Sequence, residues 1–218
     1  MFRWRRQSRP SAPLHEWLSG RNTAWFADFT EEQIAKADDG QKLLNLLVLG
    51  GVLNCASSAT ASFGGRVTHC LDNVALDALA FELLAFSFYA VRESHLPTSD
   101  DPFDETDPDE LIESYGFAIG AVPALISEKT GWEIDDLWQR RLMFYFQRKD
   151  MKDATESLVG ILLTMKDAKT PHHDYGTLSL DLAANLKLRV IAHSFASTIP
   201  KGTADVLQGL AVEHGLIL

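Results

Sequence analysis

An uncharged segment, residues 43–65, is the feature that most constrains what this chain can fold into. Its first half is a run of leucines, and its second half consists largely of small residues. Residues four positions apart lie on one face of a helix, so Gly51, Cys55 and Ala59 would leave that face shallow. A second helix could then approach closely. The segment is therefore typical of a helix at the centre of a bundle.

The same segment has about the length of a membrane span, for which roughly 20 apolar residues are needed. However, Asn45, Asn54 and the hydroxyl side chains between 57 and 62 would be poor lipid contacts. We therefore expect a buried helix of a soluble bundle. An interfacial helix, or one that lines a cofactor, is the alternative.

Composition favours an all-α fold. Leucine and alanine together account for 54 residues, whereas valine and isoleucine account for 19. Leucine and alanine lose little side-chain freedom in a helix, and β-branched residues fit strands better. A chain of 218 residues can also bury a core without disulfide or metal support. We expect residues 1–218 to form a single compact domain, a multi-helix bundle of about seven to nine helices.

A central antiparallel helical hairpin is expected to organise this bundle. Apolar periodicity predicts helices over 41–63 and 68–93, and Gly64–Gly65 would form the turn between them. The second helix is apolar on both sides, so other helices should cover it completely. The side chains expected in the core include Leu47, Phe81 and Leu84.

Capping residues and apolar periodicity predict the remaining helices. Pro123 should kink one of them, and the alternation of Leu178, Leu180 and Leu182 leaves a short strand as an alternative there. The predicted ranges are 11–20, 30–38, 107–127, 132–149, 153–168, 178–198 and 203–214.

The two cysteines point to a reducing compartment. Cys55 and Cys70 lie at unequal distances from the expected turn at Gly64–Gly65, so a hairpin would leave them out of register for a disulfide. The sequence also shows no signal-peptide pattern at its start. We therefore expect a cytoplasmic protein.

Charge is distributed unevenly along the chain. Residues 22–218 hold 15 basic and 29 acidic side chains, so this body should repel nucleic acid. The N-terminal tail, residues 1–12, instead combines Phe2 and Trp4 with four arginines. We expect the tail to fold back on the acidic body. Contact with an anionic membrane and a role in targeting are the alternatives.

Two segments of opposite charge are candidates for binding. The acidic loop, residues 98–109, has no basic side chain, and residues 137–152 mix aromatic and basic ones. The net charge of −10 argues against nucleic acid as the partner of the second segment. We expect the two segments to pair within one chain or across a homodimer, or to contact a protein or a small anionic ligand. The candidate binding residues are Asp100, Asp101, Asp104, Glu105, Asp107 and Asp109 in the loop, and Trp138, Arg140, Arg141, Arg148 and Lys149 in the basic segment.

Two groups of residues are candidates for catalysis or metal binding. His172, His173 and Asp174 adjoin one another in a loop between two predicted helices. Neighbouring side chains point apart, so a metal there would need ligands from elsewhere, and we expect a polar surface loop instead. Asp77 and Glu82 lie within an apolar helix, where burial would raise their pKa values. They are about 140° apart around the helix and do not form a pair on one face.

No short motif names a reaction. The chain lacks the glutamate and histidine spacing of di-iron bundles, a phosphate-binding glycine loop, a dinucleotide fingerprint, a nucleophile elbow and zinc-type cysteine spacing. We therefore expect neither a metal nor another cofactor, and the pattern favours a binding protein over an enzyme.

An acidic, compact, motif-poor helical protein fits a cytoplasmic protein-binding module. Such a module could be an adaptor, a regulator or an inhibitor that neutralises a basic partner, as immunity proteins and antitoxins do. One alternative is a helical-bundle enzyme with a metal or acid/base site near His172, His173 and Asp174. Another is a peripheral membrane protein anchored by its N-terminus.

Overall fold

The computed structural model describes residues 13–19, 40–70, 75–95, 108–165 and 185–198, and all regular secondary structure in these ranges is helical. The predicted all-α multi-helix bundle is confirmed. The elements are α1 (Leu14–Ser19), α3 (Gly40–Ser58), the π-helix η1 (Ala59–Phe63), α4 (Gly64–Thr68), α5 (Leu76–His95), α6 (Pro108–Thr130), α7 (Asp135–Phe146), α8 (Met151–Thr164) and a further helix at 185–198.

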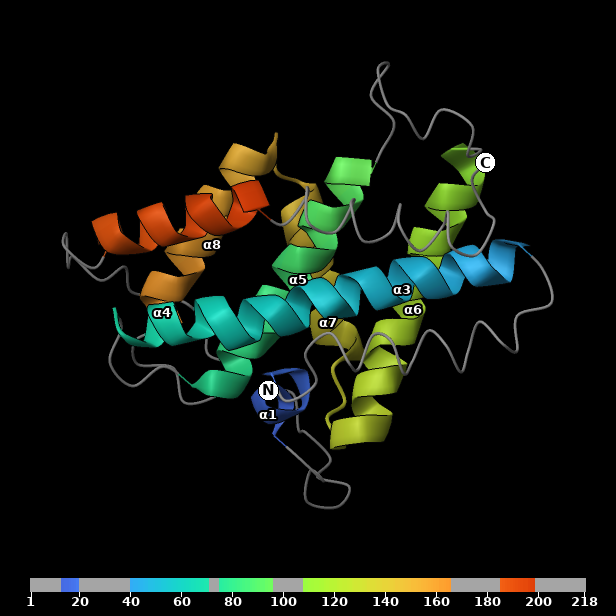
Figure 1. Cartoon of the computed structure of the whole chain (residues 1–218), viewed down its shortest axis with the longest axis horizontal. Helices are drawn as coiled ribbons and strands as arrows, with labels where there is room; N and C mark the ends of the chain where they lie inside the picture. The colour runs from blue at the N-terminus through green and yellow to red at the C-terminus, as the bar shows by residue number, and fades with distance from the viewer. Residues whose placement is uncertain (1–12, 20–39, 71–74, 96–107, 166–184, 199–218) are drawn as a thin grey trace.

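The first long helix does not end at the two glycines. α3 continues through η1 and α4, so that Gly64 and Gly65 are helical and the rod ends at Thr68 (Figure 1). Each glycine costs a helix about 1 kcal/mol relative to alanine, but burial of Phe63 and Val67 offsets that cost. The predicted turn at Gly64–Gly65 and the predicted start of the next helix at residue 68 are therefore wrong.

α5 runs through the interior. Every residue from 78 to 91 is buried, and the helix packs against α1, α3, α7 and α8. As predicted, Leu47, Phe81 and Leu84 are buried. Figure 1 shows α5 running steeply across α3. The antiparallel pairing of the two helices along their lengths stays a prediction.

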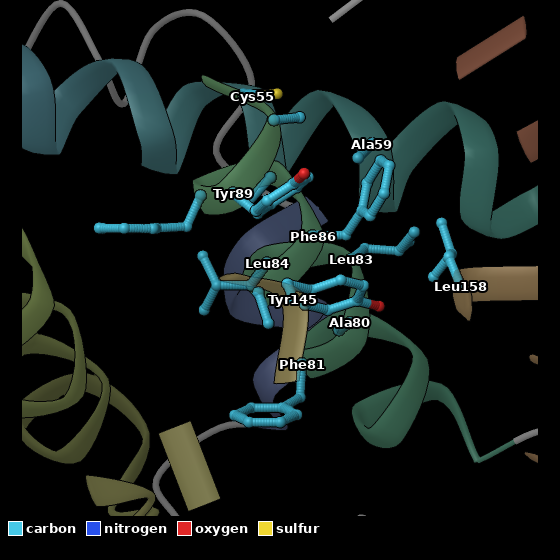
Figure 2. Packing of buried hydrophobic residues seen from close by; sticks show 14 of the residues in the cluster. Cys55, Ala59, Ala80, Phe81, Leu83, Leu84, Phe86, Tyr89, Tyr145 and Leu158 are labelled. Atoms are coloured by element: carbon cyan, nitrogen blue, oxygen red, sulfur yellow. The ribbon is translucent and has the colours of Figure 1, made fainter. Parts of the chain in front are cut away.

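Aromatic side chains join α5 to α7. Phe86 and Tyr145 meet edge to face at 5.6 Å between ring centroids, and Phe88 and Trp138 do so at 5.5 Å. This geometry brings the positive edge of one ring to the negative face of the other. Figure 2 shows Phe86 and Tyr145 near the middle of the core, with Cys55 of α3 to one side.

α6 contains Pro123, as predicted, and the structure compensates for the proline. A proline has no N–H, so it cannot donate to the carbonyl of Ile119 four residues earlier. The indole N–H of Trp138 donates to that carbonyl instead, at 2.9 Å. α6 then ends beyond its predicted limit, where Gly131 adopts φ 73° and donates its N–H to the Ser127 carbonyl at 2.9 Å.

α8 begins with reciprocal side-chain caps. The N-cap Asp150 accepts a hydrogen bond from the N–H of Asp153 at 2.8 Å, and the Asp153 carboxylate accepts one from the N–H of Lys149 at 3.1 Å. These bonds satisfy donors that a helix start leaves open.

Several predictions concern residues outside the described ranges. They are the N-terminal tail 1–12, the helices at 30–38 and 203–214, the start of a helix at Asp107, the acidic loop apart from Pro108 and Asp109, and the optional strand at 178–182. Cys55 and Cys70 are free, as expected, although the turn from which we argued this does not exist.

Candidate functional site

The two carboxylates singled out on α5 serve different partners. Asp77, in the first turn, accepts a hydrogen bond from the N–H of His15 at 3.0 Å, and the same oxygen lies 2.7 Å from His15 Nδ1. Both side chains are partly exposed, at 24% for Asp77 and 26% for His15. The contact ties α1 to the start of α5, where a negative charge also suits the helix dipole.

Glu82 is completely enclosed between α5 and α7. Its Oε1 accepts a hydrogen bond from the Tyr145 hydroxyl at 2.6 Å. The Arg141 Nε lies 3.1 Å from Oε2, although no well-aligned hydrogen bond to this oxygen forms among the described residues. The carboxylate is 0% exposed and the Arg141 side chain 11%, so this is a buried ion pair.

Burial raises the pKa of Glu82 above its ordinary value, because a charged carboxylate loses its water. The nearby Arg141 charge and the Tyr145 hydrogen bond both lower this pKa, but they do not outweigh burial. Such a group can hold a proton inside the core. Because the carboxylate is fully enclosed, the arrangement suits a link between helices better than an acid catalyst.

The predicted basic binding segment is largely committed to the protein's own fold. Trp138 is 0% exposed, and Arg141 pairs with Glu82. Arg148 lies half-buried over the Phe144 ring, at 4.4 Å from the centroid, and donates to the Phe144 carbonyl. Only the side chains of Arg140 and Lys149 are exposed among the five predicted binding residues of this segment.

Asp109 is exposed in the first turn of α6, and the remaining predicted site residues lie outside the described ranges. They are His172, His173 and Asp174, together with Asp100, Asp101, Asp104, Glu105 and Asp107. Within the described ranges, no group of three or more histidine, cysteine or acidic residues could hold a metal ion. The pairing of the acidic loop with residues 137–152 stays a prediction.

A charged cluster that sequence reasoning missed joins α8 to the helix at 185–198. The Glu156 carboxylate lies 2.9 Å from His193 Nε2 and 2.5 Å from an Arg189 guanidinium nitrogen. Arg189 is 47% exposed and His193 42%, so water screens the pair. Arg189 and His193 share one helix at four-residue spacing, but Glu156 comes from a separate predicted helix, and no spacing in the sequence relates it to them.

The helix at 185–198 also carries exposed apolar side chains. Leu186 is 61% exposed and Val190 71%, and both line a shallow groove of about 350 Å³. Cys70, Lys187 and Ile191 complete its walls.

A second exposed apolar surface lies on α6. Ile112 is 52% exposed and Phe117 43%, and Gly116, Gly120 and Ala124 are exposed beside them. We call these five residues the α6 outer face. Ile112, Gly116, Gly120 and Ala124 follow one another at four-residue spacing, so they form one row along the helix.

Acidic residues flank the α6 outer face at both ends. Glu110 and Glu113 are exposed near the start of α6, and Glu128 is exposed near its end. No charged residue lies between 114 and 127. The inner side of the same helix is buried, with Tyr115, Ala118 and Val122 in the core.

Sequence reasoning missed the α6 outer face, although a signal for it is present. Residues 114–127 carry no charge, yet they contain too many glycines and alanines to fill a core on every side. A helical projection places Gly116, Gly120 and Ala124 on the side opposite to Tyr115, Ala118 and Val122. Only the burial of each residue in the folded protein shows which side of α6 is exposed.

One described helix, Gly40–Thr68, is long and apolar enough to cross a membrane by length and composition, with a mean hydropathy of 1.5. Within the 18-residue stretch of this helix that has this hydropathy, 67% is buried inside the protein. A core helix of a bundle passes the same test.

Comparison with known proteins brings no relative. No protein-family model matches the chain, and no curated protein or solved structure is significantly similar to it. A function must therefore be argued from the residues themselves.

Proposed function

We propose that this protein is a protein-binding module, an adaptor, regulator or inhibitor, and that the α6 outer face is its contact surface. The observation that carries the proposal is an uncharged, apolar helix face left exposed on a strongly acidic chain. Exposed apolar patches bordered by polar residues are typical of interaction sites.

The residue types in this face also suit binding. Phe117 and Ile112 offer large apolar side chains that a partner could cover, and aromatic residues often act as anchors at interfaces. Gly116 and Gly120 leave the helix backbone accessible beside them. A second α-helix is the element that fits such a face best.

The alternatives lack comparable support. An enzyme site near His172, His173 and Asp174 and a membrane anchor in residues 1–12 both rest on residues outside the described ranges. Two free cysteines are in keeping with a protein that works in the reducing cytoplasm.

A photo-crosslinking residue in place of Phe117 tests the proposal in cells that make the protein. The matched control carries the same group in place of Met143, which is 56% exposed on α7. We expect a defined protein adduct from position 117 and none of the same mass from position 143.

The partner so identified is then purified and titrated with two variants. F117E should weaken its binding by at least about tenfold, whereas M143E should leave it unchanged. Equal melting temperatures of the two variants would show that the loss is not due to unfolding. Absence of any adduct at position 117, or undiminished binding by F117E, would contradict the proposal.

A further inference from the structure

We propose that the occupant of the α6 outer face is a basic amphipathic helix of the partner protein. This inference rests on the function proposed above and adds the chemistry of the partner. Three observations on α6 carry it: the exposed large apolar residues, two glycines that the packing of the described residues does not require, and the sign of the charges around them.

The first observation is the exposure of Phe117 and Ile112, which are 43% and 52% accessible. Ile112 belongs to the same row as Gly116 and Gly120, one turn before Gly116, and Phe117 lies beside that row. A helix laid along that row would contact both side chains at once. A partner with apolar residues at three- and four-residue spacing meets this requirement.

The second observation is that the packing of the described residues does not require glycine at 116 and 120. A Cβ atom at either position would meet no atom within 4 Å, and neither residue has a left-handed φ. Glycine within an exposed helix lowers stability relative to alanine. Glycine at these positions would allow a partner helix to approach the α6 backbone closely.

The third observation is charge. Glu110, Glu113 and Glu128 flank the outer face, and the single basic residue of α6, Lys129, pairs with Glu128 at 2.7 Å. A partner helix with lysine or arginine near both ends of its apolar strip would complement these acids.

A second copy of this chain fits the same face poorly. Parallel α6 helices would place Glu113 beside its own counterpart. Antiparallel α6 helices centred on Gly120 would place Ile112 and Glu113 near Glu128 of the other copy. Both arrangements bring carboxylates together, and like charges oppose association.

The test titrates the full chain with three labelled peptides and follows fluorescence anisotropy. One is an amphipathic helix with a leucine and alanine strip and lysines on its flanks, the second has glutamates in place of those lysines, and the third is residues 1–12 of this chain. We expect the lysine peptide to bind at least about tenfold more tightly than the glutamate peptide at about 0.05 M salt. This preference should shrink at about 0.5 M salt.

Variants connect the binding to α6. The double variant G116A/G120A should melt at a higher temperature than the parent, yet bind the lysine peptide at least about tenfold more weakly. G160A is the matched control, because Gly160 of α8 is also a helix glycine with open space at its Cβ position. It should raise the melting temperature without changing binding. E110Q/E113Q should weaken binding at low salt only.

Four results with these peptides and variants would overturn the inference. They are equal binding of the lysine and glutamate peptides, unchanged binding by G116A/G120A, tightest binding by residues 1–12, or a dimer in sedimentation that G116A/G120A abolishes. A non-basic partner crosslinked at Phe117 would overturn this inference alone. Failure of crosslinking at Phe117 would overturn the proposed function as well.

Discussion

At the scale of single residues, Trp138 compensates for the N–H that Pro123 lacks. The proline removes a donor from the middle of α6, and the indole of α7 supplies one to the carbonyl left without it. Trp138 is thereby fixed at 0% exposure, although its place in an aromatic and basic segment suggested a binding role. The hydrogen bond to the Ile119 carbonyl therefore gives this tryptophan a role in the fold.

W138F should lower the free energy of unfolding by about 1–3 kcal/mol, because it leaves the Ile119 carbonyl buried without its donor. In that background P123A restores an N–H four residues after Ile119. The gain from P123A should therefore exceed its gain in the parent by about 1 kcal/mol. Chemical denaturation of the four proteins measures this coupling. A coupling near zero would mean that the indole bond does not replace the missing backbone bond.

Glu82 is the second residue whose surroundings decide its behaviour. A carboxylate with a raised pKa in the folded state binds its proton more tightly there than in the unfolded chain. Its contribution to stability is therefore full below the ordinary value of 4.5 and is lost as the pH rises through the raised value.

Comparison with E82Q isolates this effect, because glutamine does not titrate and the other groups are common to both proteins. The free energy of unfolding of the parent, minus that of E82Q, should fall as the pH rises above the ordinary value of 4.5. Urea denaturation across that range measures the difference. A difference that rises with pH would mean that the ion pair with Arg141 outweighs burial.

At the scale of elements, the rod from Gly40 to Thr68 shows how packing overrides local preference. Two adjacent glycines favour a break, but the flanking turns bury apolar side chains on both sides of them. The π-helix η1 lies immediately before the glycines and takes up one extra residue within the rod. α6 ends at a glycine for the opposite reason, because Gly131 adopts a left-handed φ that other residues avoid.

Alanine substitution separates the two kinds of glycine. G65A should raise the free energy of unfolding by about 0.5–1 kcal/mol, since Gly65 is exposed, helical and has no atom within 4 Å of a Cβ position. G131A should lower it by about 1 kcal/mol, since alanine is strained at φ 73°. Thermal and chemical denaturation of both variants measure these changes. Destabilisation by G65A would contradict the helical conformation at Gly65 and favour the turn that the sequence predicted.

At the scale of the whole molecule, α5 lies among the described helices, and polar contacts link its first half to its neighbours. Asp77 binds α1 through His15, and Glu82 binds α7 through Tyr145 and Arg141. α6 packs on the long helix α3, and the α6 outer face stays exposed. The inward-facing side of α6 therefore packs in the core, and the outward side stays exposed within the part of the chain that the structure describes.

The sequence by itself determined the helical class, the burial of Leu47, Phe81 and Leu84, and the proline within α6. These follow from composition and periodicity, which are local properties of the chain. Only the tertiary structure decided the role of Trp138, the partners of Glu82, the helical conformation at Gly64 and the exposed side of α6. Each depends on which distant segments meet, and periodicity does not encode that choice. A helix with two apolar sides looks the same in the sequence, whether other helices cover both sides or one side stays open for a partner.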